Sequence, residues 1–128
     1  MESVSASVWA GRILSGIAVA FLLFDAVGKL IRVAPVVEGT AKLGYPDASI
    51  VPIGVLLVVG VVLYAVPRTS LLGAIYLAAY LGGAVASQYR VGNPIATHTL
   101  FPVYVAAVVW GGLALRNPRL LSLLSGAH

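Results

Sequence analysis

The stretch of the chain best suited to chemistry joins an apolar run to three charged residues. Asp25, Lys29 and Arg32 follow one another at spacings of four and three within residues 21–32. In a helix these spacings place the side chains on neighbouring turns of one face, where an acid can neutralise a base. A charge at the centre of a membrane-spanning helix costs about 2.5–3.5 kcal/mol on insertion scales, so it usually faces a protein interior or a wet cavity. We therefore predict that this face is the inner wall of a polar site.

A simpler alternative is that the basic side chains only extend toward the lipid headgroups. Long Lys and Arg side chains commonly do so near a helix end, and Arg32 lies at the end of its apolar run. Asp25 would then neutralise one of the bases without forming a site. Asp25 and Lys29 lie deeper in the run, so this alternative explains them less well.

A second group of polar residues comes from the third apolar run and the segment after it. One helical face is predicted by the alternating spacing of four and three residues among Tyr76, Tyr80, Gly83, Ser87 and Arg90. Because the third run is parallel to the first, the end of this face lies at the same end of a bundle as Lys29. Further polar residues at that end are Gln88, Asn93, Thr97 and His98. We predict ligand contacts from Lys29, Tyr76, Tyr80, Ser87, Gln88, Arg90 and Asn93.

The combined set suits two kinds of chemistry. Cationic and hydroxyl groups can bind an anionic or carbonyl headgroup while an apolar tail lies between the helices. Alternatively, Asp25 or His98 can act as a base while Lys29 or Arg90 stabilises an oxyanion. The sequence carries no serine elbow, glycine-rich phosphate loop or zinc signature. It has no cysteine, and a bis-histidine haem would need His128 as its second ligand, so we predict no metal site.

Composition places these residues in a membrane. Of the 128 residues, 60% are hydrophobic and 9% are charged, whereas about 25% are charged in a typical soluble domain. Four spans with short loops use the whole length, which predicts one integral membrane domain over residues 1–128. The net charge of +4 comes from basic residues scattered between apolar runs, without the basic stripe that nucleic acid needs. The lipid bilayer is therefore the expected partner, and nucleic acid is not.

The apolar runs predict an all-α membrane protein, a bundle of four transmembrane helices with one short interfacial helix. The spans are expected at about residues 12–31, 50–66, 71–89 and 100–115. Pro35 and Gly44 bracket a helix over residues 35–43, which is too short to span and is expected to cover the bundle. Asp47 or Ser49 is expected to cap the second span. The residues after Arg116 are expected to form a short tail on the membrane surface.

Loop charges give a weak signal for orientation, since four basic residues fall on each side of the predicted bundle. Those on the side of the termini are Arg12, Arg68, Arg116 and Arg119. If Lys29 and Arg90 face inward as site residues, they do not count as loop charges. On that assumption the positive-inside rule places both termini in the cytoplasm.

The order of several residues resembles the DoxX-like family of small membrane proteins. The residues that carry the resemblance are Phe24-Asp25 with Lys29, Gly44-Tyr-Pro46, Tyr80-Leu-Gly-Gly-Ala84 with Arg90, and His98 with Phe101-Pro102. The resemblance covers about residues 12–118. It implies a four-helix bundle in the inner (plasma) membrane with both termini cytoplasmic, and it singles out Asp25, Lys29, Arg90 and His98. The family is named for a subunit of an archaeal thiosulfate:quinone oxidoreductase, and relatives are described as associating with oxidative-stress proteins.

Two functional hypotheses therefore stand beside a purely structural role, in which buried charges specify helix register. The first is a bundle that binds a small lipophilic ligand such as a quinone, as an accessory subunit beside a redox enzyme. The second is a small intramembrane isomerase or hydrolase in which Asp25 and His98 are catalytic. The first hypothesis predicts an elongated cavity that opens near Arg90 and His98 and narrows toward Gly60 and Gly73. The sequence leaves open whether the protein forms a homo-oligomer.

Overall fold

The computed structural model describes residues 6–126, and most of that length is helical. The long helices are α1 (Ala6–Leu30), α3 (Ile50–Ala65), α4 (Ser70–Arg90) and α5 (Phe101–Arg116). The shorter helices are α2 (Ala34–Lys42) and α6 (Pro118–Leu124). Single helical turns at Asp47–Ser49 (η1), Pro67–Thr69 (η2) and Ile95–Thr99 (η3) precede α3, α4 and α5. Residues 6–126 contain no strand, in agreement with the all-α prediction.

Four helical segments are long and apolar enough to cross a membrane, which confirms the predicted four-span bundle. They are Ala6–Leu30, Asp47–Ala65, Pro67–Arg90 and Ile95–Arg116. The first begins earlier than the predicted residue 12, because residues 6–10 contain neither proline nor glycine to end the helix. The regular helix α5 begins at Phe101, directly before Pro102, where a missing backbone donor costs little.

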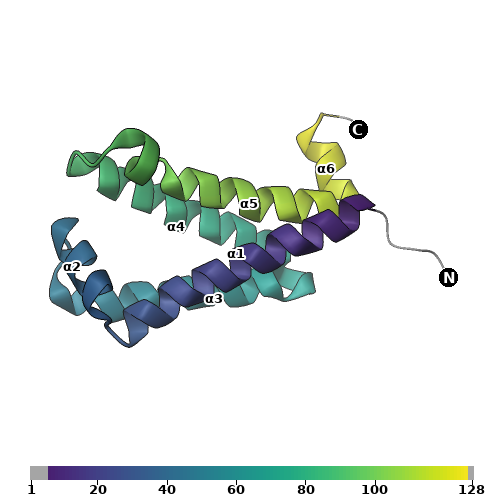
Figure 1. Cartoon of the computed structure of the whole chain (residues 1–128). Coiled ribbons are helices and arrows are strands. Elements are labelled where there is room, and N and C mark those ends of the chain that lie inside the picture. Colours follow the sequence, from purple (N-terminus) through teal and green to yellow (C-terminus); the bar gives the residue numbers. More distant parts are fainter. Residues whose placement is uncertain (1–5, 127–128) are drawn as a thin grey trace.

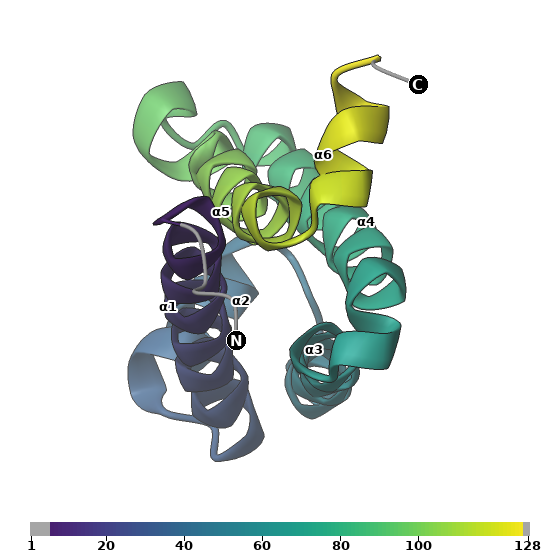
Figure 2. The ribbon, with the colours of Figure 1, turned by 90° about the vertical axis from the view of Figure 1, so that its right-hand side faces the viewer.

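The four spans form a bundle in which α1 and α4 each pack against both α3 and α5 (Figure 1, Figure 2). Apolar side chains from every span meet in its centre, among them Leu22, Leu57, Leu77 and Val109. In a bilayer this core is stabilised mainly by close packing, because lipid tails are as apolar as the side chains. Many other large apolar side chains face outward, where a bilayer would cover them.

The bundle is tightest at the end that holds the start of α1. A Cβ atom on Gly11 would lie 2.6 Å from the backbone nitrogen of Arg116, and one on Gly73 would lie 2.2 Å from the nitrogen of Tyr64. Glycine at these positions is what allows the paired helices to come so close. Toward the other end α1 and α5 separate (Figure 1), and a cavity lies between the spans there.

The short helix α2 covers that open end, as predicted for the segment between the first two spans. The chain turns sharply on both sides of α2, where Arg32 has a φ of 57° and Gly44 a φ of 88°. Glycine adopts this left-handed conformation freely, whereas an arginine is rarely found in it. The connection therefore folds back across the bundle within a few residues.

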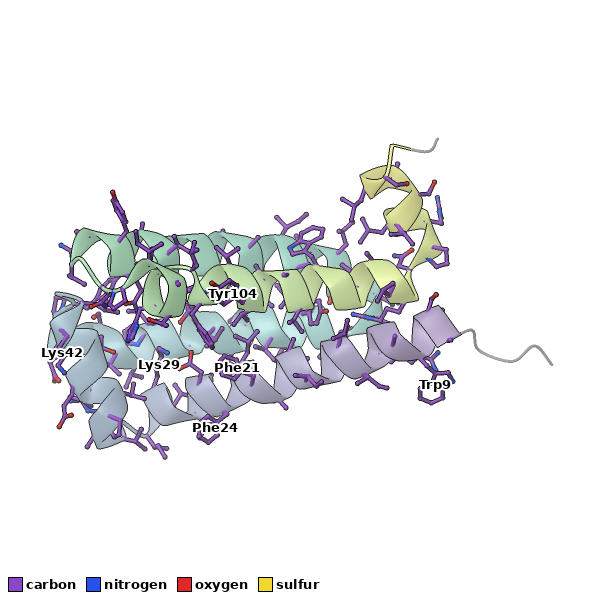
Figure 3. All side chains as sticks on the ribbon, turned by 45° about the horizontal axis from the view of Figure 1, so that its top comes forward. Trp9, Phe21, Phe24, Lys29, Lys42 and Tyr104 are labelled. Carbon is purple, nitrogen blue, oxygen red and sulfur yellow. The ribbon has the colours of Figure 1, made fainter. Side chains whose placement is uncertain are left out.

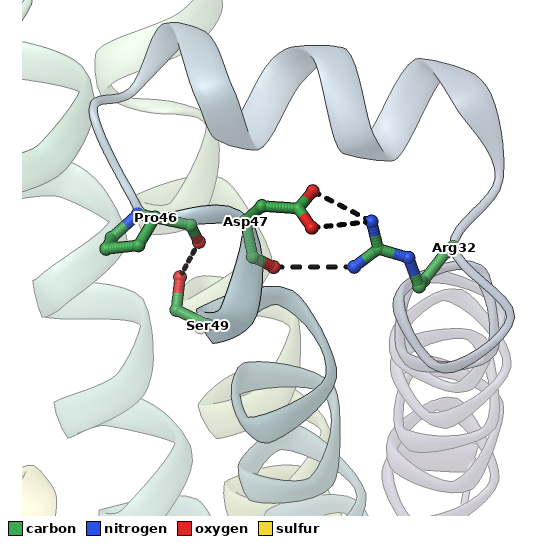
Figure 4. Close-up of polar contacts among 4 residues, drawn as sticks. All are labelled: Arg32, Pro46, Asp47 and Ser49. Atoms are coloured by element: carbon green, nitrogen blue, oxygen red, sulfur yellow. Dashed lines mark hydrogen bonds and ion pairs between the residues drawn. The ribbon is translucent and has the colours of Figure 1, made fainter.

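Two predictions about this connection are wrong. Arg32 lies beyond the end of α1, so it does not share the face of Asp25 and Lys29. Its Nη2 atom instead lies 2.7 Å from the carboxylate of Asp47 (Figure 4). Neither Asp47 nor Ser49 caps α3, since Arg32 donates to the Asp47 carboxylate and the Ser49 hydroxyl donates to the carbonyl of Pro46 at 2.6 Å.

Helix α1 begins and α5 ends at the same end of the bundle, where α6 turns away from α5 (Figure 1). Asn117 caps α6, because its side-chain oxygen accepts a hydrogen bond from the Leu120 backbone at 3.3 Å. Leu120 is itself buried against the core. Residues 118–124 thus form a helix with Leu120 packed against the core, and the position of this helix on a membrane surface remains a prediction.

Candidate functional site

The cavity at the end covered by α2 has a volume of about 480 Å³. All four spans contribute to its wall, and α2 with the turn after it completes the enclosure. Its polar lining residues are Asp25, Lys29, Thr40, Tyr45, Tyr80, Ser87 and Gln88. The rest of the wall is largely apolar. A volume of this size, apolar with a few convergent polar groups, is typical of a small-molecule site.

The charged pair predicted on α1 is present and lines this cavity. Lys29 Nζ donates to Asp25 Oδ1 at 2.7 Å, and the two side chains are 14% and 35% exposed. Figure 3 shows Lys29 at the same end of the molecule as Lys42 of α2, far from Trp9. Pairing offsets part of the cost of bringing two charges into apolar surroundings. An ammonium group has three N–H donors. Within residues 6–126 the ammonium group of Lys29 donates a hydrogen bond only to Asp25.

The opposite wall comes from α4, where Tyr80, Ser87 and Gln88 line the cavity. The Ser87 hydroxyl donates to the carbonyl of Gly83 at 2.9 Å, and the Tyr45 hydroxyl lies 2.6 Å from the same Ser87 oxygen. Tyr45 is therefore the donor to Ser87, and this bond ties the turn after α2 to α4. The hydroxyl of Tyr80 makes no hydrogen bond within the described residues, so it is available to a ligand.

Away from α2 the cavity wall is apolar, with Leu22, Leu81 and Val105 toward the centre of the bundle. Phe21 of α1 and Phe101 of α5 also line the cavity, and their ring centroids are 5.6 Å apart. The two residues are 41% and 45% exposed. These rings therefore stand between the cavity and the outer surface of the bundle.

Arg90 and His98 lie at the predicted end of the bundle but outside the cavity lining. Arg90 is exposed at the C-terminal end of α4, and its Nη2 atom donates to the carbonyl of Leu43. It makes no ion pair with Asp25. His98 is exposed in η3, and its Nδ1 atom lies 2.8 Å from the hydroxyl of Thr97. The structure therefore does not bring His98 and Asp25 together.

Tyr76 and Asn93 also contact their neighbours instead of the cavity. The Tyr76 hydroxyl donates to a backbone carbonyl of α3 at 2.6 Å, and its ring fills the space beside Gly60. The Asn93 amide donates to the side chain of Gln88, which does line the cavity. The predicted extension of the cavity toward Gly60 and Gly73 is wrong, because neighbouring helices pack directly against both glycines.

Thr40 and Tyr45 also line the cavity, although neither was predicted from the sequence to do so. Thr40 is buried on α2, and Tyr45 reaches the cavity from the turn at Gly44. An aromatic residue between glycine and proline in a short turn was the available signal for Tyr45. His128, considered above as a haem ligand, lies outside the described residues. Within residues 6–126 no three His, Asp or Glu side chains are grouped as metal ligands.

The fold and the site together define a small four-span membrane protein with an amphipathic cavity at one end of its bundle. The DoxX-like family model matches residues 13–112 of the chain, from the first turns of α1 to the last turns of α5. The protein therefore belongs to the DoxX-like family, as its residue pattern predicted. No curated protein and no solved structure matches the chain.

Proposed function

We propose that this DoxX-like protein binds a small amphiphile dissolved in the membrane, with a polar, quinone-like head and an apolar tail. The observation that carries the proposal is the division of the cavity into a polar end under α2 and an apolar end toward the bundle centre. A small water-soluble anion would gain nothing from contact with the apolar wall of the cavity. A pure hydrocarbon would leave the Tyr80 hydroxyl and the remaining donors of the Lys29 ammonium group without a partner, which is unfavourable in apolar surroundings.

The head of the ligand would lie between α1 and α4. Lys29 and Tyr80 can both donate a hydrogen bond to a carbonyl oxygen, and Asp25 holds the ammonium group in position. A quinone carbonyl is an uncharged acceptor, so it can bind beside the ion pair without adding a third buried charge. Ser87 and Gln88 offer further polar contacts on the α4 side.

The tail and its route of entry would involve the side of the bundle between α1 and α5. Because α2 covers the polar end, an amphiphile reaches the cavity most directly from the hydrocarbon layer. Phe21 and Phe101 are partly exposed on that side and also line the cavity. Aromatic rings of this kind can turn aside at small cost, since they are not enclosed by the core.

The alternative of an intramembrane isomerase or hydrolase needs a base and a second catalytic group beside the substrate. Asp25 lines the cavity, but His98 does not, so binding is the better-supported role. The family resemblance motivates a place beside a redox enzyme as an accessory subunit. It also motivates the inner membrane as the location, with both termini in the cytoplasm.

The test compares two tyrosines that lie four residues apart on α4. Protein purified in detergent is titrated with decylubiquinone while its melting temperature is followed. A ligand that binds only the folded state stabilises it by about 2.7 kcal/mol at roughly 100 times its Kd. Tyr80→Phe should weaken binding roughly tenfold, because it removes a hydrogen-bond donor from the cavity. Tyr76→Phe should bind as the wild type does, since Tyr76 does not line the cavity and its hydroxyl already donates to the backbone carbonyl of Leu56.

A second titration with decane, which has a similar chain and no polar head, should give no comparable shift. Equal quinone shifts in the wild type, Tyr80→Phe and Tyr76→Phe would mean that the quinone only partitions into the detergent, and the proposed site would be wrong.

A further inference from the structure

A second polar cluster lies at the opposite end of the bundle, around Arg116 at the end of α5. Its Nε atom donates to the hydroxyl of Ser15 at 2.9 Å, and its Nη2 atom lies 3.5 Å from the hydroxyl of Ser70. The guanidinium carbon lies 5.4 Å from the centre of the Tyr64 ring. Side chains of α1, α3 and α4 thus hold one arginine of α5.

The residues that hold Arg116 are buried and bonded to one another. The Tyr64 hydroxyl donates to the carbonyl of Val109 at 2.6 Å and lies 2.8 Å from the Ser15 oxygen. The Ser70 hydroxyl donates to the carbonyl of Tyr64 at 2.7 Å. Ser15, Tyr64 and Ser70 are at most 7% exposed, whereas Arg116 is only partly buried. The guanidinium is therefore held by neutral groups of three other helices, in a residue that is not fully buried.

The positive charge of Arg116 has no carboxylate partner within residues 6–126. The acids of that range, Asp25, Glu38 and Asp47, all lie toward the end covered by α2. The Nη1 group of Arg116 donates to none of the described residues. A guanidinium supported by neutral groups attracts an anion, and its planar fork matches two oxygens of a phosphate.

Other basic residues lie at the same end: Arg12, Arg68 and Arg119 are all exposed. Basic side chains at one end of a membrane bundle lie at the level of the lipid headgroups. The Arg12 guanidinium lies 5.4 Å from the ring centre of Trp9, an exposed aromatic of the kind enriched at that level. Phosphate groups are the anions that Arg116 would meet there.

We propose that Arg116, with Ser15, Ser70 and Tyr64 as its support, is a phosphate-binding site. Its ligand is a phosphate group, supplied by an anionic phospholipid headgroup or by free phosphate in the adjoining water. The site is independent of the cavity, which lies at the other end of the bundle. Binding would add a charge-assisted contact to the point where the four spans are packed most closely.

The experiment measures the melting temperature and the lipids retained in native mass spectrometry. Detergent-purified protein is mixed with dioleoylphosphatidylglycerol, with dioleoylphosphatidylcholine, or with inorganic phosphate. Arg116→Lys keeps the positive charge but removes the planar guanidinium that can donate two hydrogen bonds to a phosphate. Arg119→Lys is the control, because it makes the same change at an exposed arginine at the same end of the bundle. We expect phosphatidylglycerol to stabilise the wild type and Arg119→Lys, and its Kd to rise roughly tenfold in Arg116→Lys. Phosphatidylcholine, whose choline cation neutralises its phosphate, should bind more weakly.

If inorganic phosphate alone produces the same shift with the same loss in Arg116→Lys, the ligand is free phosphate and the site stands. Equal phosphatidylglycerol shifts in Arg116→Lys and Arg119→Lys would show general attraction between charges and would overturn the proposal.

Should Arg116→Lys fail to fold, Ser15→Ala keeps the arginine and removes the acceptor of its Nε atom. Its control is Ser7→Ala at an exposed position of α1. We expect a smaller phosphatidylglycerol shift in Ser15→Ala than in Ser7→Ala. A lower starting melting temperature with an undiminished lipid shift would assign the cluster to packing alone.

Discussion

Asp25 and Lys29 lie one turn apart on α1, so their ion pair needs only that helix to form. Arg116 is held in another way, by hydroxyls and an aromatic ring that come from three other helices. The two charges also differ in their surroundings, since the pair lines the cavity under α2 and Arg116 lies at the opposite end of the bundle. A pair of opposite charges is tolerated inside the bundle, whereas an arginine without an acid can remain at the headgroup level.

The ion pair on α1 can be measured by a double-mutant cycle. Asp25→Ala alone leaves the Lys29 charge without a partner in apolar surroundings, so the combination with Lys29→Ala should cost less than the sum of the single changes. We expect a coupling free energy of about 1–3 kcal/mol from thermal unfolding in detergent.

Arg90 supplies the control for this cycle, because it contacts the carbonyl of Leu43 and not Asp25. The effects of Asp25→Ala and Arg90→Ala should simply add. Additive effects in the cycle with Lys29 as well would show that the pair contributes nothing to folding.

Among the elements, α4 faces three different environments along its length. Leu77 is fully buried in the core, Tyr80 and Ser87 face the cavity, and Gly82 faces open space. The turn after helix α2 is tied to α4 by two contacts, the bond between Tyr45 and Ser87 and the hydrogen bond from Arg90 to the carbonyl of Leu43. Helix α4 contributes more residues to the cavity wall than any other helix.

The adjacent glycines of α4 allow a matched test of the cavity. A Cβ atom would meet nothing within 4 Å at either Gly82 or Gly83, but only Gly83 lines the cavity. Gly83→Leu should fill part of the cavity and abolish the shift in melting temperature produced by decylubiquinone. Gly82→Leu should leave that shift intact, and both variants should fold, because leucine favours helix by up to about 1 kcal/mol over glycine.

Loss of the shift in Gly82→Leu as well would point to a general effect of leucine on α4. Retention of the shift in Gly83→Leu would place the quinone outside this cavity.

For the whole molecule, basic residues lie at both ends of the bundle, whereas the acids of the described residues lie at one end only. Within the described residues the acids lie toward the end covered by α2, and Arg12, Arg68, Arg116 and Arg119 lie at the end where α1 begins. Both ends of the chain's helical part are at the arginine-rich end (Figure 1). Arg90 is exposed and not part of the cavity, so only Lys29 is left out of the count of loop charges, and the positive-inside rule then predicts, by four basic residues against three, that this end faces the cytoplasm.

This orientation can be tested because the chain contains no cysteine. Ala96→Cys places a thiol on the exposed connection between α4 and α5, and Ser125→Cys places one after α6. An impermeant maleimide added to intact cells should label the Ala96 variant at once and the Ser125 variant only after permeabilisation. The reverse pattern would invert the topology.

Several features were predictable because they depend on residues close together in the chain. Each span is an apolar run, the start of α5 is set beside Pro102, and the ion pair joins Asp25 to a residue four positions away. The family resemblance rests on the same kind of local pattern, and it too was confirmed. Lys29 of α1 and Tyr80 of α4 line the same cavity, and their role as ligand contacts stays a prediction.

The tertiary structure alone decided the partners of Arg32, Arg90 and Arg116, which lie 15, 47 and 101 residues away in the chain. Helical periodicity gives the direction of a side chain around its own helix axis. It does not give the position of that helix against its neighbours. That position is determined by close contacts between helices, such as the contact of Gly73 with the backbone of Tyr64. Tyr76 and Tyr80, one turn apart on the same face of α4, were predicted to share a site. In the folded bundle only Tyr80 lines the cavity, because Tyr76 lies one turn nearer the closely packed end, where its ring packs against Gly60 of α3.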